Sequence, residues 1–320
     1  MNRFWVDPHA PLPQPEQDVP GHPGLIALGL DLSAERLLEA YTRGMFPWYS
    51  EGQPVLWWSP DPRMVVFVQE FRPSRSLRRL LTRLHRQQQQ GCAPWQLTLD
   101  RNFEQVMRAC AGPREARDGT WITEDIIQAY TDLHHLGLAH SIEVWERLPA
   151  DYDTRHAAPA AHPPRKDTPA DGRFSPAPSA SPDDAIPYTD RQLIAGLYGV
   201  SIGRMFFGES MFTRRSNASK CAFAALMQLL RQHGFLMVDC QQTTRHLSSL
   251  GGRELPRTEF LERLPALLHQ PAPEWSTLQV QWPIDWPEPM RDTQASPTAG
   301  ETTSGMQPEA SCDDHGDPGS

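Results

Sequence analysis

Three polar residues interrupt otherwise apolar stretches in the second half of the chain. Glu209 stands between a glycine and a serine in "FFGESMF", where an unpaired carboxylate would be costly to bury. Asp239 and Gln241 are two residues apart in "FLMVDCQQ", and the alternation of side chains along a strand would put both on one face. A carboxylate and an amide on one face can orient an amine, although such a pair at a strand end also caps a following helix.

The surrounding sequence gives these residues a way to meet. Strands are predicted for "HSIEVWE", "QLIAGLYGV", "RMFFGESMF" and "FLMVDCQ", with a helix from about Asn217 to Gln232 before the last. An antiparallel meander of the first three strands, with the fourth beside the third, would let Glu209 face Asp239 and Gln241. These runs predict the α+β fold class for this half of the chain.

The first half is predicted to hold short helices and a strand. Ser33, Thr123 and the residues after them have the pattern of helix N-termini, and Gly44 and Gly137 stand where those helices would end. A strand is expected at 64–68 and further helices at 74–86 and 101–111.

The helix at 74–86 is basic on one face and apolar on the other. Leucines recur at helical spacing, and opposite them stand Arg75, Arg79, Arg83 and Arg86. No acidic residue occurs between Glu70 and Asp100. Such a stripe is either a solvated face or a contact surface for nucleic acid, and the sequence leaves both open.

Proline and charge are unevenly distributed over the 320 residues. The segments 1–23, 149–187 and 271–320 hold 23 of the 32 prolines, lack periodicity and carry a net charge of −12, which leaves +3 for the rest of a chain whose total is −9. We expect a disordered N-terminal tail (1–23), a small domain with the basic helix (24–100), a larger domain (101–270) interrupted by a disordered insertion (149–190), and a mostly disordered C-terminal tail (271–320).

Other signals are weaker. Cys240 and His246 are close enough for a nucleophilic pair, but alternation turns the cysteine away from the polar face. His134, His135 and His140 lack a recognised zinc spacing, so we expect helix-surface histidines and no metal site. The five cysteines form no CxxC pair, and no signal peptide or membrane span is apparent, which favours a cytoplasmic protein away from the membrane.

Several strings together closely resemble the bacterial leucyl/phenylalanyl-tRNA–protein transferases. They are FPW, WWSP, GTWIT, GESMF and NASK, and the resemblance covers about residues 24–147 and 191–265. It implies transfer of Leu, Phe or Met from aminoacyl-tRNA to proteins with an N-terminal Arg or Lys, which marks them for degradation. It also implies an acyl-CoA N-acyltransferase-like fold in the C-terminal half, activity without CoA or another cofactor, and a monomer.

The resemblance implies roles for particular residues. Asp239 and Gln241 match the polar pair at the reaction centre, and Glu209 matches an acid beside the aminoacyl ester. Gly208 would leave room for the aminoacyl side chain. The positions that match its pocket are Trp48, Trp121, Leu197, Phe206, Phe223 and Val238. With a polyanionic substrate, the four arginines of the basic helix become the expected tRNA contacts.

The sequence departs from the family pattern in a longer loop at 149–190 and in Leu30, where a second glycine is expected. Two alternatives stay open. A CoA-dependent N-acetyltransferase would need a [QR]-x-x-G-x-[GA] turn, which "QQQGCA" at 88–93 fits literally, but after the arginine helix. A non-catalytic tRNA- or peptide-binding module is the other alternative.

Overall fold

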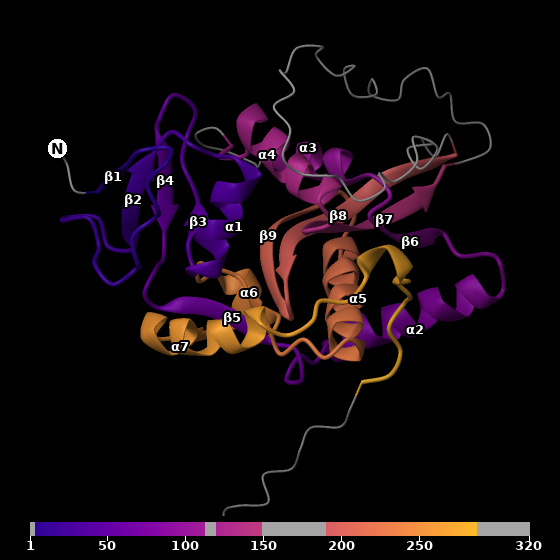
Figure 1. Cartoon of the computed structure of the whole chain (residues 1–320). Helices are drawn as coiled ribbons and strands as arrows, with labels where there is room; N and C mark the ends of the chain where they lie inside the picture. The colour runs from indigo at the N-terminus through magenta and orange to yellow at the C-terminus, as the bar shows by residue number, and fades with distance from the viewer. Residues whose placement is uncertain (1–3, 113–119, 149–189, 287–320) are drawn as a thin grey trace, which may run out of the picture. The chain divides into compact units, whose positions relative to one another are not determined.

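Two β-sheets organise the chain in the computed structural model, which describes residues 4–112, 120–148 and 190–286 (Figure 1). The smaller sheet has the strand order β1-β2-β4-β3, and the larger has the order β11-β5-β10-β9-β8-β7-β6. The strands of the smaller sheet are β1 (Trp5–Val6), β2 (Leu25–Gly29), β3 (Phe46–Pro47) and β4 (Val55–Trp58). Those of the larger sheet are β5 (Arg63–Phe67), β6 (Trp95–Leu99), β7 (Ala139–Arg147), β8 (Arg191–Ile202), β9 (Met205–Thr213), β10 (Met237–Asp239) and β11 (Arg253–Leu255).

Seven α-helices accompany the sheets in the described residues. They are α1 (Ala34–Thr42), α2 (Arg75–Gln89), α3 (Phe103–Ala111), α4 (Glu124–His135), α5 (Ala218–Gln232), α6 (Arg245–Ser249) and α7 (Arg257–Leu268). Hydroxyl groups of Ser33, Ser74 and Thr123 accept backbone N–H bonds and begin α1, α2 and α4. The α+β class is confirmed, and none of these helices is both long and apolar enough to cross a bilayer.

Helices cover both faces of the larger sheet (Figure 1). On one face α3 and α4 pack against β7, β8 and β9, and Tyr130 and Tyr198 share that core. On the other face α5 packs across the same strands, and α2 inserts Leu77, Leu81 and Leu84 beside it. Because the apolar stripe of α2 is turned inward, Arg75, Arg79, Arg83 and Arg86 on its opposite side are exposed.

The predicted meander is present. β7, β8 and β9 pair antiparallel in chain order, and β10 lies parallel to β9 after α5. The ends of β7 and β8 meet, because Arg147 pairs with Arg191 and the Leu148 N–H donates to the Asp190 carbonyl at 2.8 Å. The expected insertion between them lies outside the described residues.

The division between the sheets differs from the expected domain boundary at residue 100. β5, α2 and β6 belong to the larger sheet and its cover, so the change from one sheet to the other falls between β4 and β5. The apolar run of β5 is the reason, because Met64, Val65 and Val66 are buried between β10 and β11.

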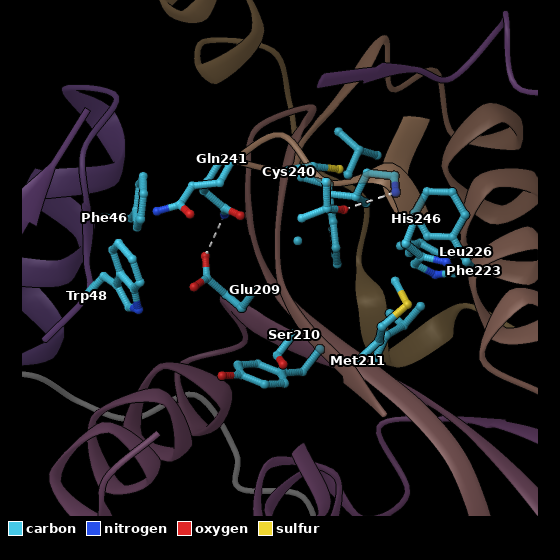
Figure 2. Close-up of a pocket in the computed structure, with 18 of the residues that line it drawn as sticks. Phe46, Trp48, Glu209, Ser210, Met211, Phe223, Leu226, Cys240, Gln241 and His246 are labelled. Atoms are coloured by element: carbon cyan, nitrogen blue, oxygen red, sulfur yellow. Dashed lines mark hydrogen bonds between the residues drawn. The ribbon is translucent and has the colours of Figure 1, made fainter. Parts of the chain in front are cut away.

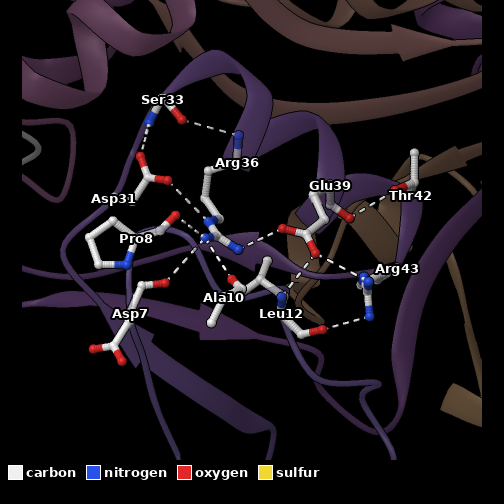
Figure 3. Close-up of polar contacts among 10 residues, drawn as sticks. All are labelled: Asp7, Pro8, Ala10, Leu12, Asp31, Ser33, Arg36, Glu39, Thr42 and Arg43. Atoms are coloured by element: carbon white, nitrogen blue, oxygen red, sulfur yellow. Dashed lines mark hydrogen bonds and ion pairs between the residues drawn. The ribbon is translucent and has the colours of Figure 1, made fainter.

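Residues 4–23 are ordered, so the expectation of a disordered N-terminal tail is wrong for them. β1 pairs parallel with β2, and Leu12 is 1% exposed. The Arg36 guanidinium on α1 donates to the carbonyls of Pro8 and Ala10 at 2.7 and 2.8 Å (Figure 3). A segment poor in aliphatic residues is thus fixed by polar contacts, which its composition does not reveal.

The start of the C-terminal segment is also ordered. Trp275 and Trp282 are 6% and 1% exposed, and the Trp275 ring stacks on His140 with 3.9 Å between centroids. His140 is therefore a buried strand residue, and His134 stacks on Phe103, so the expectation of surface histidines holds only for the exposed His135. Residues beyond 286 lie outside the described part of the chain.

Candidate active site

A β-bulge places Glu209. Across the β8–β9 pair, Tyr198 faces Ser210 and Gly199 faces Gly208, so Glu209 is the extra residue on β9. Bulges re-aim side chains and bend the strand. β8 and β9 approach each other closely here, because a Cβ on Gly199 would lie 2.3 Å from the Phe207 carbonyl oxygen.

Glu209 is held by two tyrosines and an amide from three different elements. Tyr41 on α1 donates to Oε1 at 2.7 Å, and Tyr130 on α4 donates to Oε2 at 3.1 Å. The Gln241 Nε2 donates to Oε1 at 3.1 Å. Burial in the cavity wall raises the pKa of the half-buried Glu209 to about 7, and the nearby Asp239 carboxylate adds to the rise while the tyrosine donors oppose it.

Asp239 forms an ion pair with a buried arginine. Nε and Nη2 of Arg63 donate to its two carboxylate oxygens at 2.8 and 2.6 Å, and both side chains are 0% exposed. The guanidinium lies over the rings of Phe46 and Phe260 and donates to the Gly44 carbonyl. A bidentate pair of this kind is rigid, so the carboxylate is fixed.

Gln241 turns toward Glu209 because the strand alternation ends at Asp239. Gln241 has φ +56°, a left-handed conformation, and its N–H donates to Asp239 Oδ1 at 2.9 Å. As a result Val238, Cys240 and Gln241 all line one cavity, and Asp239 does not. The expectation that Asp239 and Gln241 share a face, with Cys240 turned away, is wrong for that reason.

The cavity beside Glu209 has a volume of about 440 Å³. In Figure 2, Glu209 and Gln241 lie between Phe46 and Trp48 on one side and Met211, Phe223 and Leu226 on the other. All seven residues expected to surround an aminoacyl side chain line it: Trp48, Trp121, Leu197, Phe206, Gly208, Phe223 and Val238. The cavity is therefore largely apolar, and the hydrogen-bonded Glu209 and Gln241 lie together at one point of its wall.

Sequence reasoning missed the groups that support the two polar residues. Tyr41 and Tyr130 lie on the inward faces of α1 and α4 and look like core residues, and Arg63 opens a strand. A tyrosine hydroxyl or a guanidinium on an apolar face needs a buried partner, and this is the signal that was available.

The cysteine and histidine in the cavity wall lack the protonation states of a nucleophilic pair. Burial raises the pKa of the Cys240 thiol, so it stays protonated at neutral pH. Burial, with a smaller effect of Lys220, lowers the pKa of His246, so its ring is neutral. Both are lining residues rather than an activated thiolate and its base.

The outward face of α2 carries a patch of cations, which we call the arginine face. It comprises the exposed residues Arg75, Arg78, Arg79, Arg83 and Arg86. Among the described residues, none of the five forms an ion pair with a carboxylate. "QQQGCA" covers the C-terminal end of α2, where carbonyl groups point outward, so it cannot bind pyrophosphate as a helix N-terminus would.

Comparison with known proteins identifies the family. The model of the leucyl/phenylalanyl-tRNA protein transferase matches residues 65–149 and 186–265, and the model of the N-terminal domain of that transferase matches 30–61. The two matches meet where the two sheets divide, and the first is interrupted at the expected insertion. This chain belongs to the leucyl/phenylalanyl-tRNA protein transferase family.

Relatives named leucyl/phenylalanyl-tRNA–protein transferase agree over most of the chain. The protein from Bordetella petrii is 43% identical over 87% of this chain and 92% of its own length. Those from Azotobacter vinelandii and Cupriavidus taiwanensis are each 45% identical, over 75% and 84% of this chain and 84% and 90% of theirs. The solved structure of L-PGS from Bacillus licheniformis aligns with a TM-score of 0.29 and 11% identity, over 67% of this chain and 53% of that one, which is too distant to support an argument.

Proposed function

We propose that this protein transfers Leu, Phe or Met from aminoacyl-tRNA to the α-amine of proteins that begin with Arg or Lys, which marks them for degradation in the cytoplasm. The observation that carries the proposal is the apolar cavity with Glu209 and Gln241 at one point of its wall. Its volume of about 440 Å³ suits a side chain of this kind together with part of the ester end.

The chemistry required of the site is modest. An aminoacyl ester is already activated, and the α-amine of a peptide has a pKa of about 8. Holding the amine against the ester carbonyl can therefore supply most of the acceleration. Because Gln241 Nε2 donates to Glu209, its amide oxygen is left to accept a hydrogen bond from the incoming amine.

In this proposal Asp239 is a positioning residue. Both of its oxygens are bound by Arg63, and it holds the left-handed turn at Gln241 through the backbone N–H. It does not border the cavity, so its effect on the substrate passes through Gln241.

We further propose that the arginine face binds the tRNA through phosphates. Support comes from five exposed guanidinium groups with no carboxylate partner in the described residues. Phosphate contacts would fix the position of the tRNA without reading its sequence. The protein would act as a monomer without a cofactor, and the meander of β7, β8 and β9 followed by α5 and β10 supports the proposal of an acyl-CoA N-acyltransferase-like fold.

The test is a direct transfer assay. The protein is incubated with Phe-tRNA and a peptide that begins with Arg, and the peptide is weighed; a gain equal to one phenylalanyl residue is expected. A matched peptide that begins with Asp should stay unchanged. Acetylation by acetyl-CoA, or binding of both substrates without any product, would contradict the proposal.

A further inference from the structure

Glu209, Tyr41 and Tyr130 form a triangle in which every pair of side chains is in hydrogen-bond contact. Each tyrosine hydroxyl has one proton, so an ionised carboxylate leaves two protons for three contacts. When Glu209 is protonated, three protons are available for the three contacts, and all three hydrogen bonds can point in the same direction around the ring. Glu209 then donates to Tyr130, Tyr130 to Tyr41, and Tyr41 back to Glu209.

The surroundings of this triangle keep both protonation states of Glu209 accessible. Asp239 on β10 opposes the ionised form, whereas Arg63 on β5 favours it. Burial and the Glu209 charge raise the pKa of Tyr41 and of Tyr130 well above the usual value, so both remain neutral donors. Burial is the largest effect on the carboxyl group, and with the tyrosine donors opposing it the pKa of Glu209 is about 7.

Three of the other groups near the cavity are unsuited to accept a proton. Asp239 is enclosed by Arg63, Gln241 has an amide, and the Cys240 thiol is held in its protonated form by burial. His246 lines the cavity from α6 and is neutral, so it is the alternative base to be tested.

We propose that Glu209 takes the proton released by the attacking α-amine and holds it in the hydrogen-bonded ring with Tyr41 and Tyr130. The inference rests on the proposed function, because it concerns the amine of that reaction. It assigns a residue for proton acceptance, separate from the positioning of the amine by Gln241.

The proton balance is complete. The α-ammonium group gives one proton to the Glu209 carboxylate and becomes the free amine, which attacks the ester carbonyl. As the C–N bond forms and the C–O bond to the ribose breaks, the second proton goes to the leaving ribose oxygen. Peptide and deacylated tRNA result, and Glu209 returns its proton to solvent before the next turnover.

The test begins with the titration of the carboxyl group in the full chain without substrate. Infrared difference spectra between pH 5.5 and 8.5 should contain the carbonyl band of a neutral carboxylic acid that disappears with a midpoint near 7. The band should be reduced in Glu209→Gln. Burial also raises the pKa of Glu143 to about 7, so Glu143→Gln is the matched control, which should lose its own contribution and leave that of Glu209.

Activity supplies the second readout. In single-turnover transfer to an Arg-starting peptide, the rate of the wild type should fall as pH drops through about 7, because Glu209 must be ionised to accept the proton. In Glu209→Gln the limb of the pH–rate profile near 7 should vanish, and only the limb that reflects ionisation of the α-amine should remain. The plateau rate should be lowered by ~10²-fold or more. Glu143→Gln and His246→Gln should keep the limb.

The tyrosines act through Glu209, and the pH profile distinguishes that role from a structural one. The Tyr41 hydroxyl donates to the Glu209 carboxylate, and a hydrogen bond to a charged group stabilises the ionised form more than a bond between neutral groups stabilises the acid. Tyr41→Phe removes this donor, so the pKa of Glu209 should rise. The acid limb should therefore move to higher pH, whereas a merely structural role would lower the plateau and leave the limb in place.

Two results would overturn the inference: an ordinary acidic pKa for Glu209, or an unchanged limb near 7 in Glu209→Gln. A limb that disappears in His246→Gln instead would assign the proton to the histidine. Since the infrared titration needs no substrate, failure of the transfer reaction itself would remain distinguishable from failure of the proton assignment.

Discussion

The polar residues of the site differ in what the sequence revealed about them. Glu209 and Gln241 were predictable, because each interrupts an apolar run on a strand of the meander. The bulge at Glu209 and the left-handed turn at Gln241 were not, since both break the two-residue period from which faces are inferred. The role of Arg63 depends on a partner 176 positions along the chain, which no local pattern contains.

Gly208 allows a test of cavity size at the scale of one methyl group. A Cβ there would lie 3.6 Å from the Asp239 carbonyl oxygen and from Val238 Cγ1, which is ordinary contact, so Gly208→Ala should fold normally. Because Gly208 lines the cavity, the methyl group should select against the larger side chain. We expect transfer of Phe relative to Leu to fall about 10-fold in a competition between the two charged tRNAs, read by mass.

Gly199→Ala is the contrasting variant, because its Cβ would meet the Phe207 carbonyl oxygen at 2.3 Å and should lower stability instead. An unchanged Phe-to-Leu ratio in well-folded Gly208→Ala would show that the aminoacyl side chain lies elsewhere.

At the scale of elements, the sequence predicted most of the long ones, with the exception of the 12-residue helix α7. Helices with a hydroxyl N-cap and an apolar stripe, such as α1, α2 and α4, begin within a residue or two of the expected positions. β1 and β11 were not predicted, since strands of two and three residues carry too few side chains to show alternation. They exist because longer partners, β2 and β5, supply the hydrogen-bonding edge.

The arginine face of α2 gives the prediction at this scale. Replacing Arg75, Arg79, Arg83 and Arg86 with Gln keeps the helix propensity and the leucine stripe, so the melting temperature should change little. Binding of tRNA should weaken, and the slope of log K against log salt should flatten by roughly 0.7 to 0.9 for each phosphate that the variant no longer neutralises. The choice among Leu, Phe and Met should stay the same.

The matched control is Arg108→Gln with Arg263→Gln, because both of these partly exposed arginines already have carboxylate partners on the protein. The control should keep the wild-type salt slope. An unchanged slope in the quadruple variant would mean that the arginine face is only a solvated surface.

For the whole molecule, the composition located three atypical segments but misjudged the N-terminal one. Proline content gave the expectation of disorder at 1–23, yet Leu12 is buried, whereas the expectation of a mostly disordered segment 271–320 is compatible with the buried Trp275 and Trp282 near its start. Single buried side chains of this kind, together with a side chain such as Arg36 that binds backbone carbonyls, order a segment that has no periodic pattern. Such contacts are set by tertiary structure, which is why the sequence alone did not show them.

The third segment can be tested by replacement. β7 and β8 end side by side, with Arg147 opposite Arg191, so a short Gly-Asn turn can join them. Since each doubling of a flexible loop costs only ~0.6 kcal/mol, replacing 151–187 should change stability little and leave transfer within about twofold. Thermal unfolding and the peptide assay measure the two effects.

A scrambled segment of the same length and composition is the control for chain length. Loss of transfer in a folded short variant, with activity kept in the scrambled one, would indicate that the length itself is needed. Loss in both would indicate a specific interaction made by the native segment.

The position of β5 has a consequence during synthesis on the ribosome. Its two neighbours in the sheet are β10 and β11, and β10 begins about 170 residues after β5 ends. At ~5–20 residues per second, an emerging chain carries this apolar strand unpaired for on the order of 10–30 s. A nascent chain of this protein therefore exposes an unpaired, aggregation-prone strand until the last quarter of the sequence has been synthesised. Such a chain is the kind of client that a chaperone at the exit tunnel would shield.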